Sequence, residues 1–258
     1  MRKNAWVICC CTAVLAAFGT FFRWLQDQVC FEAETGLAVR GSIWPYAVAL
    51  MIVIAAVVLA VVCFRMKNQP HTSFPDSLPA AFAAAPRVRT IGGVVLGALL
   101  AVGGAWLMIS SGTLSSPGLQ RVLAVLAIVT GAAFARQMLA PGDAEATSGA
   151  VVCASMPIVL LAFWLIVSYK VNIINPTISA YAVEILALCA ALIAFYQLAG
   201  FAYGRPKAIK SIFWSQFAAF LCITALPDDR AGAQQLMLAA IAGILVFQSY
   251  LTASNIRP

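Results

Sequence analysis

Eight runs of about 20 mainly apolar residues constrain this chain more than any other feature. A transmembrane helix needs about 20 such residues, because the hydrocarbon core of a bilayer is about 30 Å thick. Hydrophobic residues make up 63% of the 258 residues and charged residues only 10%, too few to cover one water-soluble core of this composition. This composition excludes an ordinary soluble enzyme, a disordered protein and a disulfide-rich secreted module. We predict a single all-α polytopic transmembrane helix bundle, with eight spans at approximately 5–25, 44–65, 91–111, 119–140, 149–170, 178–203, 209–227 and 233–254.

Two of these runs allow a second interpretation. The first follows Met1-Arg2-Lys3 and could be a signal peptide, but its apolar stretch is too long and no A-x-A site follows it. We therefore expect a retained helix. The seventh run contains Ser211, Ser215 and Gln216, and if it does not cross the membrane the chain has seven spans.

The distribution of Lys and Arg predicts the orientation, because cytoplasmic segments carry an excess of them. With the N-terminus inside, eleven basic residues lie in inside segments: Arg2, Lys3, Arg65, Lys67, Arg87, Arg89, Arg136, Arg205, Lys207, Lys210 and Arg257. Five lie outside: Arg23, Arg40, Arg121, Lys170 and Arg230. We predict a plasma-membrane protein with both termini cytoplasmic. The net charge of +7 is then explained by topology, and we expect no nucleic-acid partner.

The longest inside connection, 66–90, carries Pro70, Pro75, Pro79 and Pro86, which preclude a continuous helix. We expect a basic cytoplasmic loop that lies near anionic headgroups. Binding of a protein partner by this loop is the alternative.

Most catalytic motifs are missing. The single histidine, His71, lies in the proline-rich loop, and the sequence has no zinc-binding H-E-x-x-H, P-loop or nucleophile elbow. We expect no catalytic residues, no cofactor and no metal site. The alternative is a cation site formed by Asp27, Glu32 and Glu34 in the first outside loop. Seven of the eight cysteines lie in predicted spans and should pack as small apolar residues. Lipidation is the alternative for the run Cys9-Cys10-Cys11.

Glu184 is the strongest candidate for a functional residue. It lies about six residues into the sixth run, and a carboxylate at that depth is unfavourable unless it is paired, hydrated or protonated. Lys170 ends the preceding run at the same face, and Tyr181 lies one helical turn away. We predict a Glu184–Lys170 pair with Tyr181 close by, either facing a cavity or joining two helices.

A stripe of small residues in the third run, Gly93, Gly97, Ala101 and Ala105, recurs every four positions. Such a stripe lets another helix approach closely. We predict helix packing within the bundle, and the alternative is a homo-oligomer or a protein partner docked on this face.

Several segments carry a resemblance: Tyr169-Lys170 to Asn175-Pro176, Tyr181-Ala182-Val183-Glu184, Phe195 to Lys207, and Glu34-Thr35-Gly36-Leu37. Over about a third of its length the chain resembles uncharacterised multi-span membrane proteins of anaerobic Gram-positive, Clostridia-like gut bacteria. The resemblance implies a Gram-positive plasma membrane and carries over no functional residue.

Three classes of function follow. The scarcity of polar residues within the runs favours a non-enzymatic membrane protein that scaffolds, senses or assists assembly. The alternative is a small-molecule or ion transporter that uses Glu184. An intramembrane enzyme needs a nucleophile and a base that converge, and the sequence offers no such pair.

Overall fold

The computed structural model describes residues 2–30, 41–68, 73–83, 86–110, 116–139, 148–172 and 178–256. Within these ranges the chain forms eight long helices and one short helix. They are α1 (Arg2–Cys30), α2 (Trp44–Lys67), α3 (Leu78–Ala81), α4 (Pro86–Ile109), α5 (Pro117–Leu139), α6 (Ser148–Asn172), α7 (Ile178–Ala202), α8 (Ala208–Thr224) and α9 (Gly232–Ser254). The all-helical fold predicted from the apolar runs is confirmed.

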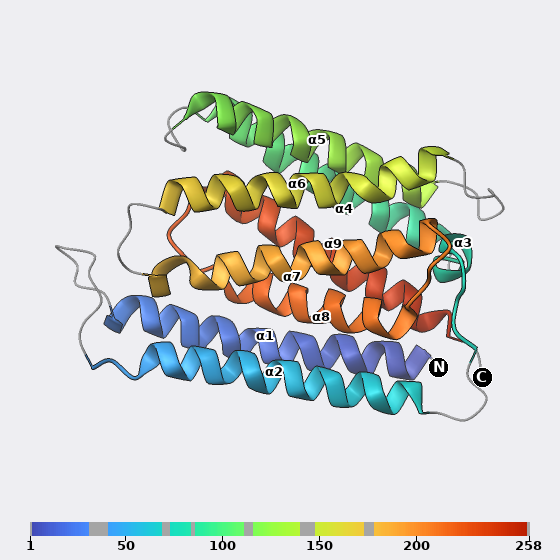
Figure 1. The fold of residues 1–258 in the computed structure, drawn as a ribbon, viewed down its shortest axis with the longest axis horizontal. Coiled ribbons are helices and arrows are strands. Elements are labelled where there is room, and N and C mark those ends of the chain that lie inside the picture. The colour runs from blue at the N-terminus through green and yellow to red at the C-terminus, as the bar shows by residue number, and fades with distance from the viewer. Residues whose placement is uncertain are drawn as a thin grey trace.

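The long helices lie side by side along one axis (Figure 1). In that view α1 and α2 form one flank, α4 and α5 form the opposite flank, and α8 contacts α1, α2, α7 and α9. The start of α1, the end of α9 and α3 share one end of the bundle, called here the α3 end. The opposite end, where α1 finishes and α7 begins, is called the Glu184 end.

The outward faces of the helices are apolar. On α2, for example, Leu50, Val53 and Val57 each expose more than half of their surface. A soluble monomer rarely leaves so large an apolar area in water. In the part of the chain that the structure describes, seven helices are long and apolar enough to cross a bilayer, whereas α8 has only 17 residues. The chain is therefore a multi-pass, integral membrane protein.

The predicted small-residue stripe packs α4 against α5 of the same chain. A Cβ atom on Gly97 would lie 2.5 Å from the backbone oxygen of Gly131, and one on Gly93 would collide with Met138. A Cβ on Gly131 would in turn lie 3.2 Å from the Cβ of Ala101. The close approach therefore depends on glycine. Ala105 is half-buried on the same helix.

The turn between α7 and α8 depends on Gly204. Its φ of 69° lies in the left-handed region that favours glycine. The turn closes with a hydrogen bond of 2.8 Å from the Arg205 backbone N–H to the Gly200 carbonyl. After this reversal α8 runs antiparallel to α7 from the α3 end and contacts α1, α2, α7 and α9.

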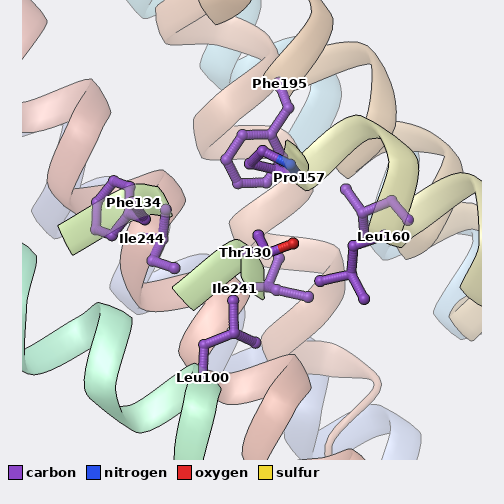
Figure 2. Close-up of a pocket in the computed structure, with 9 residues that line it drawn as sticks. Leu100, Thr130, Phe134, Pro157, Leu160, Phe195, Ile241 and Ile244 are labelled. Atoms are coloured by element: carbon purple, nitrogen blue, oxygen red, sulfur yellow. The ribbon is translucent and has the colours of Figure 1, made fainter. Parts of the chain in front are cut away.

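A small internal cavity is lined by residues of α4, α5, α6, α7 and α9, most of which Figure 2 labels. Its volume is about 10 Å³, and its lining is apolar apart from Thr130, whose hydroxyl donates to the Met156 carbonyl at 3.4 Å. Pro157, which belongs to α6, lines the cavity, and at this position the backbone of α6 lacks one N–H donor. At this size it holds no more than one water molecule and is too small for a ligand.

The proline-rich connection includes one turn of helix. In α3 and just after it, Ala81 and Phe82 are buried, and the Asn255 side-chain amide donates to the Ala81 carbonyl at 2.7 Å. This part of 66–90 is therefore attached to the end of α9. His71, Glu32, Glu34 and the Asn175-Pro176 turn lie outside the described residues.

Candidate functional site: a buried charge network at the Glu184 end

Three segments that are distant in the sequence meet at the Glu184 end. They are the last two turns of α1, the first two turns of α7, and residues 225–231 between α8 and α9. The apolar run at 5–25 continues as helix to Cys30, one and a half turns beyond its predicted end. Arg23 therefore lies two turns before the end of α1, and its side chain is buried inside the bundle.

Arg23 connects all three segments. Its side chain is 1% exposed, and its Nε lies 2.5 Å from Oδ1 of Asp228. The other guanidinium nitrogens donate to Oε1 of Gln26 at 3.0 Å and to the backbone carbonyls of Ser179 and Ala180 at 2.8 and 2.6 Å. A buried guanidinium with this full set of acceptors holds its neighbours in one geometry.

Glu184 pairs with Arg230, not with Lys170. Its Oε2 lies 3.2 Å from Nε of Arg230, and both side chains are less than a tenth exposed. Arg230 also contacts Oδ2 of Asp228 at 2.6 Å and donates to the Ala225 carbonyl at 3.1 Å. The predicted Glu184–Lys170 pair is wrong, because Lys170 is exposed in the last turn of α6.

A cavity of about 640 Å³ opens beside this network and is called here the vestibule. Tyr181 lines it with Glu184, as predicted, and Trp164 of α6 forms part of its wall. Its other lining residues are Asp27, Gln28, Val167, Ser168, Val171, Asn172, Ala180, Pro227, Asp228, Asp229, Arg230, Ala231 and Gln234. This volume falls in the usual range of small-molecule sites.

The charges around the vestibule do not balance. Arg23 and Arg230 are matched by Asp228 and Glu184 in the three buried ion pairs. Asp27, half-buried, and Asp229, exposed, also line the cavity, and neither forms an ion pair within the part of the chain that the structure describes. Among the described residues, Asp27 and Asp229 therefore add two carboxyl groups to the vestibule lining beyond those that Arg23 and Arg230 pair with.

Sequence reasoning missed the residues that complete the network. It assigned Arg23 and Arg230 to outside segments as topology determinants, and it did not connect Asp228 with either of them. A usable signal was present around Arg23, which Phe22 and Trp24 flank within an apolar stretch. Cys30, the one cysteine outside the predicted spans, is 1% exposed, and its Sγ lies 2.7 Å from Oγ of Ser42.

No protein-family model, curated protein or solved structure matches the chain.

Proposed function

We propose that this chain is an eight-span plasma-membrane protein with both termini in the cytoplasm and the vestibule open to the outside. Two observations support this topology. An α8 of 17 residues is about 26 Å long, which is at the lower limit for a span. The eleven-to-five distribution of basic residues favours a cytoplasmic α3 end.

In this membrane protein the vestibule binds a small organic cation, such as a protonated amine or a quaternary ammonium ion. The observation that carries the proposal is the pair of unmatched carboxylates, Asp27 and Asp229, in a cavity of about 640 Å³. Tyr181, which is half-buried, adds an aromatic wall, and an aromatic face attracts a cation by about 0.5–2 kcal/mol.

An organic cation fits this site better than a metal ion. Among the described residues no group of three His, Cys, Asp or Glu side chains is arranged to hold a metal. The two unmatched carboxylates face a cavity of molecular size, which suits a charge carried on a larger body. Among the described residues that line the vestibule there is no cysteine or histidine, and the proposal includes no catalytic step.

This proposal favours two of the roles expected from the sequence. A scaffold needs no vestibule, whereas a sensor or a transporter binds its ligand in one. The position of Glu184, buried in the vestibule wall and paired with Arg230, favours a transporter, because a cation that approaches Glu184 competes with Arg230 for the same carboxylate.

Thermal unfolding of the purified protein in lipid nanodiscs tests the binding. The probes are choline, tetramethylammonium and spermidine chlorides, each compared with sodium chloride at equal ionic strength. We expect at least one cation to raise Tm in a saturable way, because a ligand that binds only the folded state stabilises it.

The matched variants locate the site. Asp27→Asn and Asp229→Asn should each weaken binding about tenfold, which corresponds to about 1.4 kcal/mol. Asp76→Asn removes an exposed carboxylate from the connection at the α3 end and should leave binding unchanged. Absence of a cation-specific rise in Tm, or an equal rise in the Asp27→Asn/Asp229→Asn variant, would refute the proposal.

A further inference from the structure

A second group of polar side chains is buried between α8 and α9, away from the vestibule. On α8, Ser215 and Gln216 are 0% exposed, and on α9, Gln248 and Ser249 are 3% and 1% exposed. The two residues of α9 lie in the half of that helix nearer the α3 end. Between them and Asp228, α8 carries the buried stretch 218–222, which has no polar side chain except the thiol of Cys222.

One hydrogen bond sets the relative depth of the two helices here. The Gln216 side-chain amide donates to Oγ of Ser249 at 3.0 Å, and it also lies 3.5 Å from Sγ of Cys9 on α1. Because Gln216 and Ser249 are bonded, their chain neighbours Ser215 and Gln248 lie at the same depth. Through the contacts of Gln216 with Cys9 and Ser249, the helices α1, α8 and α9 meet at this buried side chain.

Three oxygens at this depth have no partner. Oε1 of Gln216, Oε1 of Gln248 and Oγ of Ser215 are buried and make no hydrogen bond to any described part of the protein. Leaving such a group unsatisfied costs about 1–3 kcal/mol, and hydrocarbon around the bundle supplies no donor. Native structures normally satisfy such groups with an internal water molecule or another bound species.

We propose that internal water molecules occupy this site between α1, α8 and α9, donating hydrogen bonds to the side chains of Gln216 and Gln248. Water fits because the unpartnered groups are neutral amide and hydroxyl oxygens. A carboxylate, which a divalent cation prefers, is not among them. The site is distinct from the vestibule, so the inference does not depend on the proposed ligand.

Two neighbouring cysteines on α1, Cys9 and Cys10, serve as the reporter of this site and as its control. Cys9 contacts Gln216, whereas its neighbour Cys10 is exposed on the outward face of the same helix. In lipid nanodiscs, X-ray hydroxyl-radical footprinting oxidises side chains that touch ordered water. We expect Cys9 to be oxidised several-fold faster than Cys10, as measured by mass spectrometry of α1 peptides.

Two variants remove the water-binding groups one at a time. Gln216→Leu and Gln248→Leu should each lower the oxidation rate of Cys9 at least twofold and leave Cys10 unchanged. If one variant fails to fold, the other still decides the outcome. Oxidation of Cys9 no faster than that of Cys10, or a Cys9 rate unchanged in every variant that folds, would show that the site is dry and overturn the inference.

Discussion

Arg23 and Asp228 lie 205 positions apart in the chain, yet Nε of Arg23 is 2.5 Å from Oδ1 of Asp228, and both side chains are buried. Removal of one partner from a buried pair leaves the other charge without compensation. We therefore expect Arg23→Met to lower the free energy of unfolding by about 3–5 kcal/mol. Thermal unfolding in detergent measures the loss. Arg121→Met, which removes an exposed arginine near the start of α5, should change stability by less than about 0.5 kcal/mol.

Substitution of Glu184 and substitution of Arg230 should lower the free energy of unfolding by different amounts. Glu184→Gln leaves Arg230 paired with Asp228, so we expect a loss of only about 1–2 kcal/mol. Arg230→Gln leaves Glu184 without a cation and should cost about 3–5 kcal/mol.

A double-mutant cycle tests this pairing directly. The Glu184→Gln/Arg230→Gln variant should show a coupling energy of about 0.5–3 kcal/mol between the two positions. The corresponding cycle with Lys170→Gln should show none, because Lys170 is exposed. Coupling of Glu184 to Lys170 in place of Arg230 would contradict the geometry described above.

Two glycines make a matched test of the contact between α4 and α5. A Cβ at Gly97 would lie 2.5 Å from the Gly131 backbone oxygen, so Gly97→Ala must push the helices apart at a cost of about 1–3 kcal/mol. At Gly118 the nearest atom, Oγ of Ser116, is 4.0 Å from the added Cβ, and Gly118→Ala should be neutral or stabilising by up to about 1 kcal/mol. Chemical denaturation of the two variants compares them, and equal effects would argue against close packing at Gly97.

Local sequence predicts the helices but not the charge network. The apolar runs identify the long helices, because the thickness of the bilayer requires about 20 mainly apolar residues in each span. The stripe at Gly93 and Gly97 likewise predicts a close helix contact, although it does not name α5 as the partner. These features depend on residues near one another in the chain.

The network depends on contacts between distant segments. The Glu184–Lys170 prediction assumed that consecutive spans supply each other's partners, whereas Arg230 reaches Glu184 from the connection between α8 and α9. Arg23 and Asp228 belong to segments that meet only because α1 packs against α8. No local pattern encodes that packing, so the vestibule could not be predicted from the sequence.

Labelling of single introduced cysteines tests whether α8 crosses the membrane. Lys207 and Asp229 are exposed residues that bracket α8, so they face opposite sides only if α8 is a span. In intact cells we expect an impermeant maleimide to label Asp229→Cys, and to label Lys207→Cys only after lysis. Ser73→Cys and Arg121→Cys are controls for the α3 end and the Glu184 end, and the unmodified chain gives the background from its own cysteines. Labelling of both Lys207→Cys and Asp229→Cys from the same side would establish seven spans. Labelling of Lys207→Cys alone in intact cells would reverse the orientation and place the vestibule in the cytoplasm.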